Sequence, residues 1–301
     1  MSLLVTGSIG IDNVITPHGQ AEEVLGGSSV YFALAAVQYV PVRFVGVVGE
    51  DFPPAFRDLL ASRHIDLTGL EVRRGSRTFR WTGKYVGDMN RAETVDIQVN
   101  VLAEAAPKVP PAFADSEVVF LANTNPVLQR EMLAQVNAPK LTVCDTHEHW
   151  IGSERDALIE TLQAVDGVII NDGEARAFTG GHNLITAGKQ ILRLGPRFVV
   201  IKKGEHGALL VTTDGATAVP AYPTEKVKDP TGAGDSFAGG MLGYLAAEGR
   251  FNTAELRRAL VRGTVSASFA IEDFSLRRVM KVTRAEIDAR VAELVQMLRF
   301  E

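Results

Sequence analysis

The sequence predicts an α/β fold of three layers, with a mostly parallel central sheet between helices and a small β-sheet lid. Short apolar runs rich in β-branched residues alternate with stretches of helical period. This alternation is typical of βαβ units, which build a parallel sheet covered by helices on both faces. The chain after Asp235 has only helical patterns, whereas residues 70–102 have strand-like period two and no helical stripe.

Six apolar runs are expected to form strands of the central sheet, because each is short and rich in valine, isoleucine, leucine or phenylalanine. In chain order they cover residues 3–9, 42–49, 117–122, 141–145, 165–170 and 197–204. Amphipathic helices are expected between them, for example at 52–64 and 130–136. Three further helices are expected at 235–248, 253–271 and 283–298.

The segment 70–102 interrupts the α/β alternation and predicts a small separate sheet, joined by the extended stretch 12–25. A sheet inserted beside a parallel sheet suggests a lid over a binding site. We therefore expect a single α/β domain over residues 1–301, with a lid formed by about 12–25 and 70–102. An exposed lid can pair edge to edge with a second copy, so a homodimer through this sheet is a further expectation.

Composition and charge exclude several classes of partner. The 301-residue chain is 46% hydrophobic and 22% charged, which is the balance of a soluble globular protein. Its net charge of −5 and scattered arginines argue against a nucleic-acid partner. The absence of a basic leader and of a long apolar run predicts a cytoplasmic location and no membrane partner. The single cysteine, Cys144, lies in an apolar run and is expected in the core.

The segment DPTGAGDSFAGG, residues 229–240, carries the strongest chemical signal. Apolar residues at helical spacing and Gly249 at a left-handed capping position predict a helix that begins near Gly234. The first turn presents unpaired backbone N–H groups, so it can hold an anion such as a transferring phosphoryl group. Asp235 lies in the same turn, where the helix dipole favours a charged carboxylate that can accept a proton. The alternative is a tight turn whose acidic residue complements the dipole.

Five other segments occur in a fixed order along the chain: GSIGID, LGGSSVYFALAA, VGVVGEDF, NDGE and KKGEHG. Together with DPTGAGDSFAGG they resemble the ribokinase-like, or PfkB-type, carbohydrate kinases over the whole chain. The resemblance implies a ribokinase-like fold and transfer of the γ-phosphoryl group of ATP, with Mg²⁺, to a hydroxyl of a sugar, nucleoside or related polyol. It implies that Asp235 is the catalytic base. The residues that it places at the phosphates are Gly232, Ala233, Gly234, Asp229 and Thr231.

The NDGE segment, Asn171 to Glu174, follows an expected strand and opens a helix. By itself it predicts a capping box with Asn171 as N-cap and Glu174 three residues later. It also matches the N-x-x-E motif of the resembled family, which implies that Asn171 lies at the nucleotide and that Glu174 orders Mg²⁺ through water. We favour the functional interpretation because the TGAGD motif follows in the expected order.

The KKGEHG segment lies at the end of an expected strand and, from its residues alone, predicts a polar hairpin with two glycines. In the resembled family this turn borders the nucleotide, which implies nucleotide contacts for Lys202, Gly204 and Gly207. Lys202 stands where that family often has threonine. A lysine at this position can neutralise phosphate charge.

The LGGSSVY segment precedes an apolar helix, and its glycines can form a simple helix entry with a following serine as the cap. The resemblance implies that Gly26 and Gly27 let the acceptor lie against the backbone and that Asp12 binds its hydroxyls. Tyr31 stands in this acceptor segment where ribokinases carry asparagine, which predicts an acceptor other than plain ribose. The remaining candidates for an aromatic-lined acceptor side are Phe79, Trp81 and Tyr85.

Several alternatives stay open. The acceptor can be a sugar, a nucleoside or an inositol, and a monovalent cation such as K⁺ is a further expected cofactor. A non-catalytic ligand-binding homologue is the alternative to an enzyme. A dinucleotide-binding or P-loop enzyme is disfavoured because neither glycine motif occurs at the required spacing. His147 and His149 invite a zinc interpretation, but without a third ligand a solvated loop is expected there.

Overall fold

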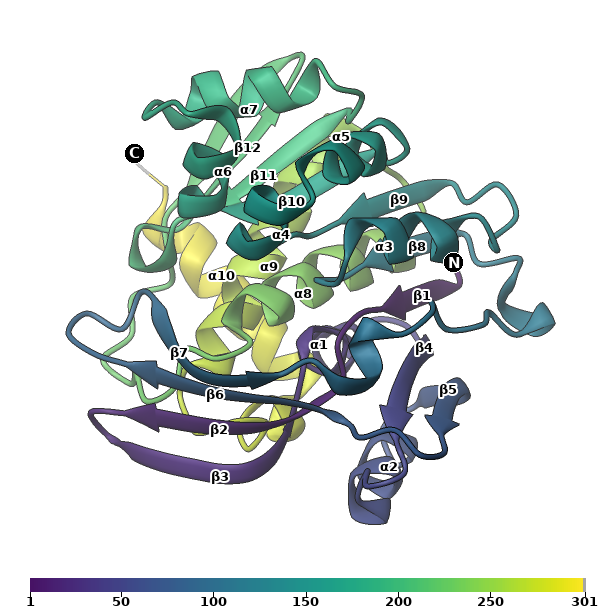
Figure 1. Ribbon diagram of the computed structural model, residues 1–301. Coiled ribbons are helices and arrows are strands. Elements are labelled where there is room, and N and C mark those ends of the chain that lie inside the picture. Colours follow the sequence, from purple (N-terminus) through teal and green to yellow (C-terminus); the bar gives the residue numbers. More distant parts are fainter. Residues whose placement is uncertain (300–301) are drawn as a thin grey trace.

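The computed structural model describes residues 1–299 and contains a central sheet of nine strands (Figure 1). In spatial order the strands are β13 (Gly215–Val219), β12 (Ala208–Thr212), β11 (Phe198–Lys202), β10 (Gly167–Asn171), β9 (Leu141–Cys144), β8 (Val118–Leu121), β1 (Leu3–Thr6), β4 (Val42–Gly49) and β5 (Ile65–Arg73). The strands from β11 to β5 are parallel, and β12 and β13 add antiparallel pairs at one edge. All six expected strands are present, which confirms a mostly parallel sheet.

Alternate strand residues enter two separate cores, because successive side chains of a strand point to opposite faces. In β1, Leu3 and Val5 belong to one core and Leu4 to the other. The helices that supply the first core are α1 (Ser28–Ala36), α2 (Pro54–Ala61), α8 (Ala233–Glu248), α9 (Thr253–Ala270) and α10 (Arg284–Met297). Those of the second are α3 (Pro126–Leu133), α4 (Glu148–Ser153), α5 (Arg155–Gln163), α6 (Asp172–Thr179) and α7 (Leu184–Leu192). The predicted three layers and three C-terminal helices are confirmed.

A second sheet of four strands forms the lid and lies beneath the central sheet in Figure 1. Its spatial order is β3 (Gly19–Gly26), β2 (Gly10–Thr16), β6 (Phe79–Tyr85) and β7 (Ala92–Gln98). The prediction was wrong at one boundary, because residues 70–73 pair with β4 and continue the central sheet. Period two is the same in both sheets, so only the pairing partner distinguishes them.

No described helix is long and apolar enough to cross a bilayer.

Helix α8 lies between α1 and α9, and its interior glycines make this close packing possible. A Cβ atom on Gly239 would lie 2.3 Å from the carbonyl oxygen of Phe32 in α1. A Cβ atom on Gly240 would lie 2.1 Å from the hydroxyl oxygen of Ser266 in α9. The cost of glycine in a helix, about 1 kcal/mol relative to alanine, is therefore offset by the approach of two neighbouring helices.

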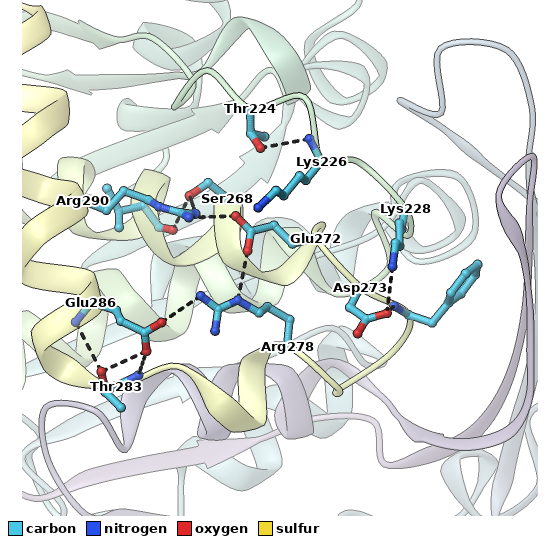
Figure 2. A network of polar contacts seen from close by, with 12 residues as sticks. Thr224, Lys226, Lys228, Ser268, Glu272, Asp273, Arg278, Thr283, Glu286 and Arg290 are labelled. Carbon is cyan, nitrogen blue, oxygen red and sulfur yellow. Dashed lines mark hydrogen bonds and ion pairs between the residues drawn. The ribbon is translucent and has the colours of Figure 1, made fainter.

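The segment between α9 and α10 is fixed by a charged network (Figure 2). The Glu272 carboxylate accepts hydrogen bonds from Arg278 Nε at 2.9 Å and from Arg290 Nη2 at 2.7 Å. At the other end of the network, Lys228 Nζ lies 3.7 Å from Asp273 Oδ1. This pair connects the segment to the start of the DPTGAGD loop, which leads into α8.

Candidate active site

Neighbouring parallel strands bring three polar residues to one edge of the central sheet. Lys202 ends β11, Asn171 ends β10 in register with it, and Asp145 follows β9. In open α/β sheets, ligands bind at the carboxyl ends of the strands. The first turn of α8 and its Asp235 complete this group from the opposite side, since a Cβ atom on Gly234 would lie 2.9 Å from Lys202 Nζ.

Helix α8 begins at Ala233, with Gly232 as its N-cap in the left-handed conformation at φ 72°. This conformation favours glycine. A side chain on Gly232 would also collide with the ring of Tyr31, 2.2 Å from its Cγ atom. The predicted helix start and the left-handed cap at Gly249 are confirmed. The Ala233 N–H donates to the Pro230 carbonyl oxygen at 3.1 Å, whereas the N–H groups of Gly232, Gly234 and Asp235 have no backbone acceptor among the described residues and can face an anion.

Burial raises the pKa of the half-buried Asp235 carboxyl to about 7, with a further increase from the charge of Asp145 and a decrease from Lys202. The helix dipole was expected to favour the charged form of Asp235 at neutral pH. Desolvation outweighs the dipole, so protonated and charged forms are both populated near neutrality. A carboxyl group with a pKa near the operating pH is well matched to accept and release a proton.

Lys202 is the cation in a group of acidic residues. Its Nζ atom lies 3.7 Å from Asp145 Oδ2, and both side chains are largely buried. Burial alone would lower the pKa of Lys202, but the charges of Asp145 and Glu174 outweigh it and keep the pKa raised. An ammonium group therefore lies against the predicted anion hole, where it can neutralise a phosphate.

Asn171 and Glu174 form the predicted capping box at the start of α6. The Glu174 N–H donates to Asn171 Oδ1 at 2.8 Å, and the Asn171 N–H donates to Glu174 Oε2 at 2.7 Å. Burial, and then the charge of Asp145, raise the pKa of Glu174 to about 8. The other carboxylate oxygen, Oε1, makes no hydrogen bond within the described residues. The box is thus compatible with a second role for Glu174.

The acidic side chains of the site fit a magnesium ion that is held mainly by the phosphates of a bound nucleotide. Asp145, Glu174 and Asp235 surround one lysine, and carboxylate oxygens are the groups that Mg²⁺ prefers. Within residues 1–299, no group of three His, Cys, Asp or Glu side chains can hold a metal by itself. Mg²⁺ keeps several waters and binds phosphates together with one or two carboxylates. A few nearby carboxylates without a complete protein metal site are therefore what a nucleotide-bound Mg²⁺ requires.

Asp229 and Thr231 shape the loop that precedes α8. The N–H groups of Thr231 and Ser275 donate to the two Asp229 oxygens, at 2.9 and 2.8 Å. Asp229 is 1% exposed, so its carboxylate stabilises the loop from inside the protein. The Thr231 hydroxyl lies 3.2 Å from the hydroxyl of Tyr85 in the lid. This contact joins the lid to the predicted phosphate site.

Asp12, on β2 of the lid, is 4% exposed and its Oδ1 atom has no hydrogen-bond partner among the described residues. Burial, and then the charge of Asp229, raise the pKa of Asp12 to about 7, and Asp235 adds to this rise. The Asp12 and Asp235 carboxyls therefore interact across the site. A buried carboxylate with an unpaired oxygen is costly and indicates a binding role.

The two glycines of LGGSSVY make room for the protein itself. A Cβ atom on Gly26 would lie 1.8 Å from Asp12 Oδ2, and one on Gly27, at φ 102°, would lie 2.4 Å from the carbonyl oxygen of Ser8. Gly27 is the N-cap of α1, and the Ser28 N–H donates to the Ser8 hydroxyl oxygen at 2.9 Å, so neither Ser28 nor Ser29 is the cap. The serine cap was wrong, because the Ser28 hydroxyl instead lies 3.0 Å from the Ser8 hydroxyl.

The lid face that carries Asp12 also carries apolar side chains. Trp81 is the register partner of Asp12 on β6, and Ile97 is the partner of Trp81 on β7. Cross-strand partners lie on the same face of a sheet. Trp81 is partly exposed and Ile97 is 53% exposed. An apolar surface thus lies beside the unpaired Asp12 carboxylate.

Other predicted site residues have packing roles in the structure. Tyr31 is 2% exposed with its ring against Gly232, so it supports the predicted anion hole from below. Gly207, at φ 82°, would place a Cβ atom 2.0 Å from the carbonyl oxygen of Val219 in β13. Gly204, at φ 53°, lies against Asn90 of the lid. KKGEHG forms the predicted hairpin between β11 and β12.

The DTHEHW segment differs from the expected loop. Residues 148–153 form α4, and His147 Nδ1 accepts a hydrogen bond from the His149 N–H at 3.2 Å. Asp145 in this segment was overlooked, although an acidic residue at the carboxyl end of a parallel strand is a recognisable signal. Cys144 is fully buried, as expected.

The sequence pattern of the pfkB family of carbohydrate kinases matches residues 5–282. The chain belongs to this family. A cytidine kinase from Thermococcus kodakarensis is 31% identical over 252 residues, which cover 81% of this kinase and 88% of the relative. The predicted enzyme class, an ATP-dependent kinase of sugars or nucleosides, is confirmed.

Solved structures agree with this kinase in fold. A Burkholderia thailandensis nucleoside kinase in complex with inosine has a TM-score of 0.80 and 22% identity, over 98% of this chain and 99% of that one. A putative ribokinase II from E. coli, in complex with ATP and Mg²⁺, has a TM-score of 0.77 and 19% identity, over 97% and 99%. The ribokinase-like fold is therefore confirmed.

Proposed function

We propose that the kinase phosphorylates a nucleoside, with Asp12 holding the ribose, the Trp81 side of the lid holding the base, and Asp235 activating the acceptor hydroxyl. The observation that carries this proposal is the buried, unpaired carboxylate of Asp12 beside a partly exposed apolar lid face. A sugar acceptor needs only the carboxylate of Asp12. A nucleoside needs both, because its ring base has apolar faces that stack on aromatic side chains.

The ribose chemistry selects the reacting hydroxyl. A carboxylate can accept hydrogen bonds from two neighbouring hydroxyls, and the 2′ and 3′ hydroxyls are the vicinal pair of a nucleoside. When Asp12 binds this pair, the 5′ hydroxyl is the one left to approach Asp235. The charge of Asp235 adds to the rise in the pKa of Asp12, in agreement with two carboxyls that face the same site.

The kinase residues then have distinct tasks. Asp235 accepts the proton of the 5′ hydroxyl as it attacks the γ-phosphorus. The backbone N–H groups at Gly232 and Gly234 and the Lys202 ammonium stabilise the negative charge of the transferring phosphoryl group, while the Ala233 N–H donates to the Pro230 carbonyl and shapes the turn. Mg²⁺, when bound with ATP, would neutralise phosphate charge, and Asn171, Glu174 and Asp145 are the residues that would hold its water shell.

Three finer expectations belong to this proposal. K⁺ is expected as a further cofactor, and titration of K⁺ against Na⁺ in the kinase assay tests it. A homodimer is expected through the lid, because every residue of the edge strand β7 is exposed, including Val95 at 60%. Size-exclusion chromatography with light scattering tests the dimer. A cytoplasmic location remains an expectation from the sequence.

The acceptor assignment is tested with a panel of pyrimidine and purine nucleosides, ribose, fructose and myo-inositol, each with ATP and Mg²⁺. We expect one nucleoside to exceed ribose in kcat/KM by at least about tenfold, because the base adds contacts that ribose lacks. The product should be the 5′-monophosphate, identified by ³¹P NMR. Preference for a sugar would refute the nucleoside assignment, and no turnover with any acceptor would refute the enzyme itself.

Replacement of Asp12 by alanine should lower kcat/KM for the nucleoside by roughly 10- to 100-fold, because hydrogen bonds to a charged group are lost. The KM for ATP should stay the same. The matched control is Asn13→Ala, since Asn13 is the next residue of β2 and its side chain bonds to Thr82 and to the backbone of Glu23. A loss confined to ATP kinetics would contradict the assignment of Asp12.

A further inference from the structure

The turn between β6 and β7, residues 86–91, extends from the lid to the nucleotide side of the site. At its base, Tyr85 contacts the Thr231 hydroxyl, as described above. Met89 in the turn is 8% exposed and packs with Tyr85 and with Val14 of β2. The turn is therefore anchored to the strand that carries Asp12, on the acceptor side.

The tip of this turn contacts the hairpin that follows β11. Asn90 Nδ2 donates to Glu205 Oε1 at 3.2 Å, and a Cβ atom on Gly204 would lie 2.4 Å from Asn90 Oδ1. The Asn90 N–H donates to Asp88 Oδ1 at 3.1 Å, which fixes the local turn. One side of the tip thus touches the glycine turn that Lys202 leads into.

The adjacent residue, Arg91, lies over the first turn of α6. Its Nη2 atom is 3.6 Å from Glu148 Oε1, and a Cβ atom on Gly173 would lie 2.4 Å from the same Nη2. Gly173 is part of the capping box that holds Glu174. The Arg91 side chain is 74% exposed, so it does not pack in a core. Its only carboxylate partner among the described residues is itself half exposed.

We infer that Arg91 is a catalytic residue of this kinase. When ATP is present, the Arg91 side chain breaks its ion pair with Glu148 and binds the phosphate oxygens of the nucleotide. The inference rests on the proposed kinase site and adds to it a residue from the lid. An exposed ion pair contributes about 0–1 kcal/mol, so Arg91 can exchange its partner at little cost. A guanidinium group binds phosphate through two parallel N–H bonds, which a single carboxylate contact at 3.6 Å does not provide.

The charges around the site support this exchange. Within the described residues, Lys202 is the one cation among Asp145, Glu174 and Asp235, and Glu148 adds to the negative potential on Glu174. ATP brings further negative charge, and an arginine can stabilise the charge of the transferring phosphoryl group in addition to Lys202 and Mg²⁺. Arg91 and Tyr85 belong to the same hairpin of the lid. When the lid closes over the acceptor, it therefore also positions the Arg91 side chain at the phosphates.

The inference is tested with Arg91→Ala, Arg91→Lys and Glu148→Gln in the full-length kinase. We expect Arg91→Ala to lower kcat by roughly 10- to 100-fold at saturating ATP and nucleoside, because a charge-assisted contact in the transition state is lost. Arg91→Lys should recover part of this loss, and added guanidinium ion should partly rescue Arg91→Ala. Glu148→Gln should lower the KM for ATP, because a competing carboxylate is removed.

Two comparisons decide between this role and a purely structural ion pair. If the pair is structural, Arg91→Ala and Glu148→Gln will be equally impaired and guanidinium will not rescue, which would overturn the inference. The matched control is Lys84→Ala, a cation on the exposed face of β6, whose loss should leave kcat unchanged. Thermal unfolding of each variant verifies that the fold is intact.

A binding measurement separates failure of this inference from failure of the kinase function. Calorimetric titration with ATP and Mg²⁺, without acceptor, should show weaker binding by Arg91→Ala, by about tenfold, and unchanged binding by Lys84→Ala. Weaker binding together with an inactive wild-type protein would refute the kinase function and support Arg91. An active wild-type protein with normal kcat and normal ATP binding in Arg91→Ala would refute the inference alone.

Discussion

At the scale of single residues, the site contains carboxyl groups whose burial is unfavourable for folding but suits binding and proton transfer. Asp12 and Asp235 both have a pKa raised to about 7 by burial, and one oxygen of Asp12 has no hydrogen-bond partner in the described part of the chain. Such groups are costly in a folded protein unless a ligand satisfies them. Their different surroundings match different tasks, since Asp235 lies in the first turn of α8 and Asp12 lies on the lid.

Replacement of Asp235 by asparagine tests the proposed base. We expect turnover to fall by roughly 10²- to 10⁴-fold, because the amide keeps the size of the side chain but cannot accept a proton. ATP should still bind, since the backbone N–H groups and Lys202 remain. Single-turnover kinetics with calorimetric ATP binding measure both quantities, and near-normal turnover would remove Asp235 from the base role.

At the scale of elements, local patterns predicted the three C-terminal helices to within two residues at each end, whereas the helix expected at 130–136 begins four residues earlier, as α3. Sheet membership was also predicted less well. The capping box of Asn171 and Glu174 and the caps of α8 were readable because all their contacts lie within a few residues. The boundary between β5 and the lid was misplaced by about four residues, because Leu70 to Arg73 alternate in the same way in either sheet. The pairing partner, β4, lies more than twenty residues earlier in the chain.

The interior glycines of α8 provide a prediction at this scale. Gly239→Ala should lower the free energy of unfolding by roughly 1–3 kcal/mol, because its Cβ atom would collide with the α1 backbone. Gly152→Ala in α4 is the matched control, since within the described residues no atom beyond its chain neighbours and its own helix backbone lies within 4 Å of the added Cβ. The control should be neutral or stabilising by up to about 1 kcal/mol. Urea unfolding measures both, and equal effects would contradict the packing argument.

At the scale of the whole molecule, the lid and the central sheet meet at an interface with several buried acidic groups. Asp12 comes from the lid, whereas Glu174 and Asp235 begin helices on opposite faces of the central sheet. Their pKa values are raised to about 7, 8 and 7, so each group binds its proton more strongly in the folded state than in the unfolded chain. Their favourable contribution is complete below pH about 4 and is lost as the pH rises through these values.

This linkage predicts the pH dependence of Asp12→Asn. The neutral amide removes a buried charge, so the variant should gain stability over the wild type as the pH rises from about 4 to 7. The gain should grow by at most about 1.4 kcal/mol per pH unit and then level off. Urea unfolding across this range measures it, and a pH-independent difference would contradict the raised pKa of Asp12.

A second carboxyl group provides a control of opposite sign. The backbone N–H of Thr283, followed by the side chains of Arg278 and Thr283, lowers the pKa of Glu286. The charged form of Glu286 therefore stabilises the fold above its unfolded pKa, and this contribution is lost as the pH falls through the folded value. Glu286→Gln should become less stable than the wild type as the pH rises, in contrast to Asp12→Asn.

The sequence alone determined the α/β class, six of the nine strands of the central sheet, the start of α8 and the residues of the TGAGD and NDGE motifs, because each depends on contacts within one turn or one strand. Only the tertiary structure placed Lys202 beside Asp145, the Tyr31 ring under Gly232, and Arg91 over Gly173. The partners of these contacts lie 57 to 201 positions apart in the chain. Which residues meet at such separations is decided by how strands pair and how the lid folds back, and a local pattern contains no record of it.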